Sequence, residues 1–383
     1  MDAARRTLLP TEEAADLLDL VGELGRKELD PLVAEDEQAH RFPREVFRTL
    51  GRAGLLGLPY PEEYGGSDQP YEVYLQVIEE LARHWLAIAV GVSVHTLSCH
   101  GLVNYGTAEQ KERWLPDLLG GELLGAYCLS EPAHGSDAAN LDTRAAADGE
   151  DYLIDGTKAW ITHGGEADFY TVLARTGGPG PKGISAFLVE GKAEGLTAAP
   201  PERKLGMRAS ATAQLHFDQV RVPAARRLGA EGAGFDLAMH ALDAGRLGIA
   251  ACGVGLAQAA LDAAVEYART REQFGKPIIE HDGVGFMLAD MATRIEMGRA
   301  GYLAAARLRD HGLPYSRQAA AAKLFCTDSA MAVAVDAVQV LGGYGYTSDF
   351  PVERFMREAK VLQIVEGTNQ IQRRVIARHL ARG

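Results

Sequence analysis

Residues 126–137 read Ala-Tyr-Cys-Leu-Ser-Glu-Pro-Ala-His-Gly-Ser-Asp, an apolar run that delivers the hydroxyl of Ser130 just before a turn broken by proline and glycine. Residues 158–165, Lys-Ala-Trp-Ile-Thr-His-Gly-Gly, repeat this arrangement, since a β-favouring run ends in Thr162 and a Gly-Gly break, with the indole of Trp160 beside it. Together the two segments predict hydroxyl groups for the polar edge of a bound ring and an aromatic wall for its face.

Outside these segments the spacing of apolar residues along the chain changes twice. From Glu12 to about Leu119 the apolar residues recur at helical spacing, and from Leu123 onward short β-favouring runs alternate with Asp-Gly, Gly-Pro-Gly and Val-Pro turns. Long amphipathic helices return afterwards and are expected over 235–271, 284–311 and 317–341. We therefore predict an α+β multidomain fold with an N-terminal α-helical domain (1–122), a middle β-barrel or sandwich domain (123–230) and a C-terminal antiparallel four-helix bundle (231–383).

A doubly wound parallel sheet is disfavoured, because alternating β and α units are absent. Gly253-Val-Gly255 resembles part of a dinucleotide fingerprint, but it lies inside a helical run with no strand before it.

The bulk composition limits the class of protein. At 383 residues the chain is long enough for two or three packed units, and 47% hydrophobic with 24% charged residues is typical of globular proteins. A net charge of −13 disfavours nucleic acid as a partner, although an anionic ligand is still allowed because binding follows the local field.

The sequence also argues against several kinds of site and location. Cys99, Cys128, Cys252 and Cys326 form no Cys-x-x-Cys pair, and the eleven histidines form no His-Glu-x-x-His set, so no metal site is expected. The first residues are followed by no long apolar segment, and the run 247–257 is shorter than the ~18 residues of a membrane span. We expect a cytoplasmic protein with reduced thiols and no membrane contact.

The strand that ends in Ser-Glu-Pro, the following Gly-Ser-Asp and the Trp-Ile-Thr strand resemble the acyl-CoA dehydrogenase family, and the resemblance covers almost the whole chain. It implies FAD as cofactor, an acyl-CoA substrate in fatty acid metabolism such as β-oxidation, and trans-2-enoyl-CoA as product. It also implies an electron-transferring flavoprotein as acceptor and a homotetramer built as a dimer of dimers.

Val365-Glu-Gly-Thr-Asn-Gln370 precedes a last helix expected over 371–381. On residue chemistry alone Thr368 or Asn369 would cap this helix, and a carboxylate before its N-terminus suits the helix dipole. The resemblance implies instead that Glu366 is the catalytic base that removes the proton from the carbon beside the thioester carbonyl, while a hydride leaves the next carbon for flavin N5. A base of this kind is strengthened by burial, which raises a glutamate pKa toward about 6–7.

Other members of the family carry the base on a bundle helix, immediately before an arginine that matches Arg246. This chain has Gly245 at that position. The presence of Glu366 together with Gly245 therefore indicates the branch of the family with the C-terminal base.

The resemblance also implies the cofactor-binding residues. Tyr127, Leu129 and Ser130 would contact the flavin ring, with Trp160 and Thr162 on its opposite side. The positions expected to reach FAD across a subunit interface or from the loop of the base are Arg271, Gln273, Phe274, Gln339, Gly343, Thr368 and Gln370. Without the resemblance, Trp160 is a core aromatic, and Arg271 to Gly275 is a helix end with a glycine cap, as is Gly342-Gly343.

Ser136, Asp243 and Arg246 match positions along the path of the acyl-CoA. Their plainer interpretations are a helix cap by Ser136 with Asp137 and an i,i+3 ion pair between Asp243 and Arg246. A basic region suits a CoA phosphate or a solvated face and comprises Arg203, Lys204, Arg208 and Arg221. The departures from the family pattern are His134, His163 and Val365, which replace a small residue, an asparagine and a tyrosine.

Three alternatives remain open from the sequence. An acyl-CoA oxidase would differ only in letting O₂ reach the reduced flavin, and steady hydrogen peroxide production would identify it. A monooxygenase would leave Glu366 without a role. A non-catalytic flavoprotein or carrier-protein-binding scaffold would show no flavin bleaching when mixed anaerobically with saturated acyl-CoAs.

Overall fold

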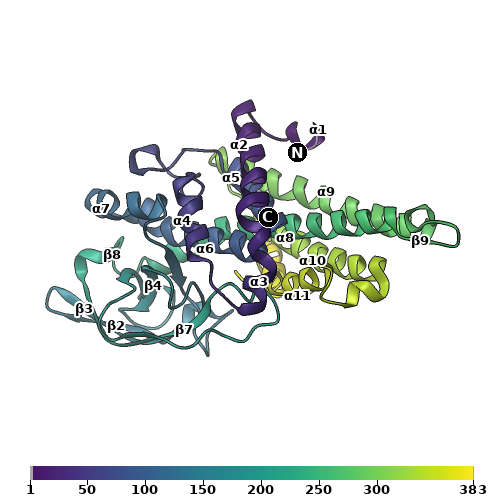
Figure 1. Cartoon of the computed structure of the whole chain (residues 1–383). Coiled ribbons are helices and arrows are strands. Elements are labelled where there is room, and N and C mark those ends of the chain that lie inside the picture. Colours follow the sequence, from purple (N-terminus) through teal and green to yellow (C-terminus); the bar gives the residue numbers. More distant parts are fainter. Residues whose placement is uncertain (1–2, 383) are drawn as a thin grey trace.

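The computed structural model describes residues 3–382, in which a helical segment, a β segment and a second helical segment follow one another (Figure 1). Figure 1 shows the strands of the eight-stranded sheet gathered at one end of the molecule, with the long helices of the C-terminal segment reaching to the opposite end. The expected order of helical, β and helical units is confirmed.

The first segment is helical because its apolar residues are spaced to bury one face. Thr11 starts α2 by accepting a hydrogen bond from the backbone of Ala14, and Thr107 with Gln110 forms a capping box that starts α7. A π-helical turn over Gly25–Leu29 joins α2 to α3. The helices are α1 (Ala3–Arg6), α2 (Glu12–Leu24), α3 (Asp30–Ala39), α4 (Arg44–Arg52), α5 (Tyr71–His84), α6 (Leu86–Tyr105) and α7 (Ala108–Leu119).

The β segment forms an eight-stranded mixed sheet in the order β6-β7-β3-β2-β4-β5-β8, with β1 paired parallel to β4 off this path. Between Lys158 and Ile161 the pairing of β3 with β7 shifts register, as at a β-bulge. The strands are β1 (Gly125–Cys128), β2 (Arg144–Asp148), β3 (Asp151–Thr162), β4 (Phe169–Arg175), β5 (Ile184–Glu190), β6 (Leu196–Ala198), β7 (Thr212–Pro223) and β8 (Arg227–Leu228).

The four C-terminal helices that were expected begin and end within three residues of the predicted bounds, and α11 was not predicted. They are α8 (Gly234–Thr270), α9 (Asp282–Asp310), α10 (Ser316–Leu341), α11 (Val352–Leu362) and α12 (Asn369–Arg382). Buried alanine and glycine residues along α8 let it pack closely against α10 and also against α5 and α6 of the first segment. This packing joins the two helical units through one apolar core, so residues far apart in sequence meet on α8.

The glycine cap expected at Gly275 is wrong. α8 ends at Thr270, and the chain then forms a short hairpin of β9 (Glu272–Gln273) and β10 (Lys276–Pro277). Phe274 and Gly275 are its two turn residues and both have positive φ, 54° and 81°, as a type I′ turn requires. The tertiary fold places this hairpin at the end of the molecule farthest from the sheet (Figure 1).

The expectation that no segment is long and apolar enough for a membrane span is also wrong. Three helical stretches reach that limit by length and composition alone: Leu86–Tyr105, Gly234–Thr270 and Ser316–Tyr346. In the first of them 89% of the most apolar window is buried inside the protein. α6 is apolar on all sides because other elements of the core surround it.

Candidate active site

Glu366 lies in the short loop between α11 and α12. The loop is closed by a hydrogen bond of 3.0 Å from the backbone of Asn369 to the carbonyl of Gln363. Glu366 and Gly367 both adopt positive φ, 51° and 89°, so a non-glycine residue is held here in a disfavoured conformation. The Oγ1 of Thr368 accepts from the backbone of Ile371 at 3.3 Å, which confirms Thr368 as the cap of α12. Asn369 is already the first residue of the helix.

The carboxylate of Glu366 is buried without a donor. Neither of its oxygens is exposed, and neither has a hydrogen-bond partner within the described part of the chain. Burial raises the pKa of Glu366 to about 7, against the opposing attraction of Lys323 and Arg246. A buried carboxylate with a purely structural role normally accepts hydrogen bonds from nearby donors. Because this carboxylate has none among the described residues and its pKa is raised, its environment is typical of a catalytic base.

α8 passes beside this carboxylate at Gly245. A methyl group built on Gly245 would overlap Oε2 of Glu366. The carboxylate therefore occupies the space that a side chain on α8 would fill. This geometry agrees with the inference that Glu366 takes the place of a base at position 245.

The strand ends near Ser130 and Trp160 lie side by side. The backbone of Ala159 donates to the carbonyl of Ser130 at 2.9 Å, which joins the end of β1 to β3. Trp160 sits at the register shift of β3 with φ of 62°, and 62% of its surface is exposed. The interpretation of Trp160 as a core aromatic is therefore excluded, because the bulge turns its indole outward from the sheet.

Tyr127 and Leu129 lie on and just beyond β1 and are buried, while Ser130 and Thr162 are half-buried. The hydroxyl of Tyr127 has no hydrogen-bond partner among residues 3–382. Burial raises the pKa of Tyr127, and the charge of Glu366 adds to this effect, so the two side chains face the same region. The strand ends and the loop of the base thus converge.

A buried ion pair that sequence reasoning missed supports this wall. Nζ of Lys158 donates to Oε1 of Glu131 at 2.8 Å and to the carbonyl of Leu129 at 3.1 Å. Glu131 also accepts from the backbone of Asp142 and Thr143 at 2.6 and 2.9 Å. The signal in the sequence was a lysine directly before the apolar run 159–161 of a β-strand, because a lysine that is buried there needs a partner.

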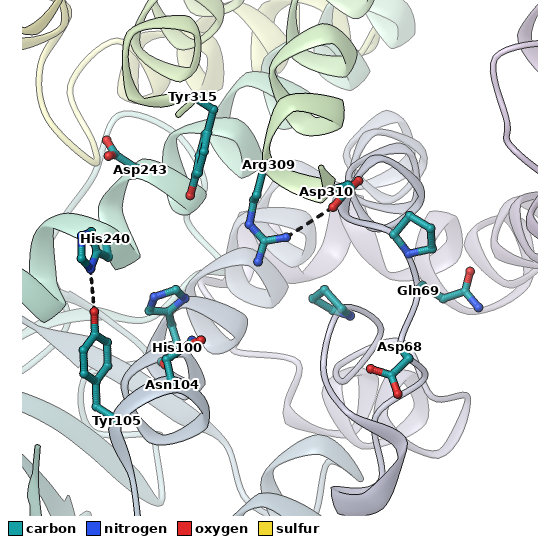
Figure 2. Close-up of a pocket in the computed structure, with 12 residues that line it drawn as sticks. Asp68, Gln69, His100, Asn104, Tyr105, His240, Asp243, Arg309, Asp310 and Tyr315 are labelled. Carbon is teal, nitrogen blue, oxygen red and sulfur yellow. Dashed lines mark hydrogen bonds and ion pairs between the residues drawn. The ribbon is translucent and has the colours of Figure 1, made fainter. Parts of the chain in front are cut away.

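A cavity of about 660 Å³ opens between α6, α8 and α9 (Figure 2). In Figure 2 the guanidinium of Arg309 pairs with Asp310 at 3.6 Å, while the hydroxyl of Tyr105 bonds to His240. Asp243, one of the predicted substrate-binding residues, also lines the cavity. A second, narrow cavity shares His100 and Arg309 with the first and reaches Gly245, beside the carboxylate of Glu366. The two cavities trace a path from the surface toward the base.

Asp243 and Arg246 form the i,i+3 ion pair expected on residue chemistry, and Asp243 also accepts from Oγ of Ser316 at 3.0 Å. Ser136 is exposed, and Asp137 precedes only a 3-10 turn (Ala138–Asn140), which it does not cap through its side chain. The expected cap at Ser136 and Asp137 is therefore wrong.

The residues expected to reach a neighbouring subunit's cofactor lie apart from this site. Arg271, Gln273, Phe274, Gln339 and Gly343 are all exposed, and Phe274 is 96% exposed. The first three belong to the hairpin region at the end of the molecule opposite the sheet (Figure 1). Gln370 is also exposed, at the start of α12. Within one chain these exposed residues therefore do not meet the residues around Glu366 and Trp160.

The basic region and the departures have local structural roles. Arg221 pairs with Asp148 and Asp151 at 2.6 and 3.0 Å on the surface. His134 contacts Asp142 at 3.2 Å, and Val365 packs against the core beside the base. Nδ1 of His163 bonds to the carbonyl of Gly125 at 3.0 Å, and burial lowers the pKa of His163 to about 4. Among the described residues no group of three or more His, Cys, Asp or Glu side chains is arranged to hold a metal.

Comparison with known proteins agrees with this architecture. The family models of the acyl-CoA dehydrogenase N-terminal, middle and C-terminal domains match residues 11–122, 126–220 and 232–381. An acyl-CoA dehydrogenase of Bacillus subtilis is 45% identical, over 97% of this chain and 99% of the relative.

Two solved structures are similar over their whole length. Butyryl-CoA dehydrogenase from Megasphaera elsdenii has a TM-score of 0.95 at 40% identity and covers 100% of both chains. A chain from a study of the electron transferring flavoprotein of Acidaminococcus fermentans has a TM-score of 0.96 at 42% identity and also covers 100% of both chains. The chain therefore belongs to the acyl-CoA dehydrogenase family, whose members are flavin-dependent oxidoreductases.

Proposed function

We propose that Glu366 is the base of the dehydrogenation and removes the C2 proton of an acyl-CoA thioester. The observation that carries this proposal is the buried carboxylate beside Gly245, both of whose oxygens lack a donor. Leaving a carboxylate uncompensated in the interior is costly, and such a cost is typical of catalytic groups whose pKa must lie near the operating pH. A pKa of about 7 suits the acceptance of a proton from a weak carbon acid.

The strand ends fit a flavin. An indole held outward on a rigid strand supplies a flat wall, and the half-buried hydroxyls of Ser130 and Thr162 supply polar contacts at its edge. Tyr127, Leu129, Ser130, Trp160 and Thr162 would hold FAD here, with Thr368 and Gln370 reaching it from the loop of the base. When bound, the flavin supplies the two-electron acceptor for the hydride that leaves C3. The protein's own residues orient the thioester and exclude water from Glu366.

The path of the substrate follows the two cavities. The wider one has the volume and the mixed charges to take the pantetheine part of CoA, beside Asp243 and Arg309. The narrower one, of about 10 Å³, leads along Thr96 and Leu97 of α6 to Gly245, so the side chains that line it must move apart for a thioester to reach the carboxylate. Arg246 and Ser136 complete the set of residues proposed to contact the substrate.

An electron-transferring flavoprotein is the proposed acceptor of the electrons. A 42% identical chain from a study of such a flavoprotein supports this proposal. A homotetramer is also proposed, because the exposed positions Arg271, Gln273, Phe274, Gln339 and Gly343 lie apart from the site of their own chain and would serve a neighbouring subunit's FAD.

Anaerobic mixing of Glu366→Gln with butyryl-CoA and longer acyl-CoAs tests the proposal. General-base loss predicts flavin reduction slower by about 10²–10⁴-fold, with the yellow cofactor still bound. Glu150→Gln, at the exposed turn between β2 and β3, is the matched control and should reduce at the wild-type rate. Retained reduction in Glu366→Gln would show that another group is the base.

A further inference from the structure

Lys323 is a buried cation on α10, next to the loop that carries Glu366. Its side chain has no exposed surface and lies on the face of α10 that includes Ala319, Cys326 and Ala330. A lysine at a core position requires acceptors, because an unpaired buried ammonium is costly. Its two acceptors both belong to the segment around Glu366.

Nζ of Lys323 donates to the carbonyl of Gly367 at 3.0 Å and to Oδ1 of Asn369 at 2.9 Å. Asn369 is in turn fixed by Thr327 and Asp328, to which its Nδ2 donates at 3.0 and 2.7 Å. Lys323 therefore holds the loop at its positive-φ glycine and at the residue two positions further on. The first of these hydrogen bonds is made to the residue that directly follows Glu366.

The loop needs this support. Positive φ at Glu366 disfavours its conformation by an amount on the order of 1 kcal/mol or more, so the surrounding contacts must hold it. Nε2 of Gln372 donates to the carbonyls of Gly367 and Glu366 at 2.8 and 3.3 Å. The carbonyl of Gly367 thus accepts from α10 and from α12 at once, which fixes the peptide that follows the positive-φ glycine.

Several charges face Glu366 and Lys323. Lys323 of α10 and Arg246 of α8 both attract the carboxylate of Glu366, while Tyr127 on β1, Tyr74 on α5 and Cys252 on α8 are affected by its negative charge. Burial lowers the pKa of Lys323 to about 8, with the charges of Glu366 and Asp328 opposing this effect and Arg246 adding to it. Lys323 is still mainly protonated at neutral pH.

We propose that Lys323 is a positioning residue for Glu366, which holds the loop just after the base through hydrogen bonds to the carbonyl of Gly367 and the side chain of Asn369 and favours the ionised carboxylate through its charge. This inference rests on the proposed role of Glu366. It assigns Lys323 two separable contributions, a donor that sets geometry and a charge that sets the pH at which the base becomes active.

Three variants separate these contributions. Lys323→Met removes both donor and charge, Lys323→Gln keeps a donor without the charge, and Lys323→Arg keeps the charge with a different donor geometry. Lys360→Met, which removes an exposed lysine of α11 that bonds only to Gln363, is the matched control. Each holoenzyme is measured for kcat and KM from pH 5.5 to 9, for flavin content and for thermal unfolding.

Lys323→Met is expected to lower kcat by about tenfold or more, because small displacements of a catalytic group are costly, and to change KM much less. The acid limb of kcat/KM should move to higher pH by about one unit in Lys323→Met and Lys323→Gln, since a favourable charge near the carboxylate is lost. Lys323→Arg should keep the wild-type acid limb despite a lower kcat. Lys360→Met should match the wild type throughout.

The pH profile is a readout that a purely structural role would not move. If Lys323→Met does not fold, Lys323→Gln carries the same test of the charge. An acid limb at the wild-type pH in either folded, flavin-loaded variant overturns the inference. If Glu366→Gln still turns over, the proposed function itself fails, and this outcome is distinguishable because it is measured in a different variant.

Discussion

At the scale of single residues, Gly245 and Glu366 share one space. The sequence indicated the base at Glu366 partly because Gly245 lacks a carboxylate, but it did not show that the two positions are adjacent. The overlap between a methyl group on Gly245 and Oε2 of Glu366 gives this pairing a steric basis. A side chain at one position excludes the observed placement of the carboxylate from the other.

Gly245→Ala is therefore expected to displace the carboxylate of Glu366 and to lower kcat by about tenfold or more while leaving the fold intact. The displaced atoms belong to the end of a flexible side chain, so the protein should still unfold near its wild-type temperature. Gly301→Ala on α9 is the control, because a methyl group there meets nothing within 4 Å. Wild-type kcat in Gly245→Ala would contradict the proposed position of the base.

The rate should depend on pH through the same carboxylate. With a pKa of about 7, Glu366 is protonated and inactive in more acidic solution, so kcat/KM should rise about tenfold per pH unit below 7 and level off above it. Steady-state rates with one acyl-CoA across pH 5.5 to 8.5 measure this limb. A flat profile down to pH 5.5 would show that the base ionises far below the expected range.

The free energy of unfolding should change with pH in the opposite direction to the rate. Because the pKa of Glu366 is raised from 4.5 to about 7 on folding, the folded state holds a proton that the unfolded chain releases between these values. Its contribution to stability is therefore present below about pH 4.5 and is lost as the pH rises through about 7. Glu366→Gln should raise the unfolding temperature at pH 8 more than at pH 5, whereas Glu150→Gln should show no such difference.

At the scale of elements, the flavin wall depends on how β1 meets β3. Trp160 is turned outward by a register shift, and the strand ends are tied by Lys158 and Glu131. Runs of apolar and β-favouring residues predicted these strands, but a bulge is set by the pairing with β7 and cannot be derived from β3 alone. The core interpretation of Trp160 failed for this reason.

Lys158→Met should destabilise the protein by about 3–5 kcal/mol, because it leaves Glu131 buried without its cation. Urea unfolding measures this loss, and flavin retention should fall with it. Adding Glu131→Gln to Lys158→Met should recover part of the stability by removing the uncompensated charge. Lys192→Met, in the exposed loop after β5, should change stability by less than about 0.5 kcal/mol.

At the scale of the whole molecule, the eight-stranded sheet and the hairpin of β9 and β10 lie at opposite ends (Figure 1). An exposed phenylalanine at a type I′ turn is unfavourable in water unless another surface covers it. The family resemblance predicted a role for Arg271, Gln273 and Phe274 in a neighbouring subunit, and their placement outside the site of their own chain is compatible with that proposal.

Phe274→Ser should weaken assembly and flavin retention while each protomer stays folded. Light scattering coupled to size-exclusion chromatography and the flavin-to-protein absorbance ratio measure these effects. Leu20→Ser, which removes an exposed apolar side chain on α2, is the control and should leave both unchanged. An unchanged mass and flavin content in Phe274→Ser would argue against a role for the hairpin in assembly.

The sequence by itself determined the order of the units and most helix and strand positions, because these depend on periodicity. Local capping preferences left Thr368 and Asn369 as the candidates for the cap of the last helix, and a recognisable motif led to the proposal of Glu366 as the base. Only the tertiary structure decided the adjacency of Gly245 and Glu366, the hydrogen bond from Lys323 to Gly367, the pairing of Lys158 with Glu131 and the cavity beside Arg309. Each of these depends on which distant segments pack together, and local sequence preferences do not specify that packing. Lys323 is an example: it lies on an apolar face of its helix, but its two acceptors lie more than forty residues further along the chain.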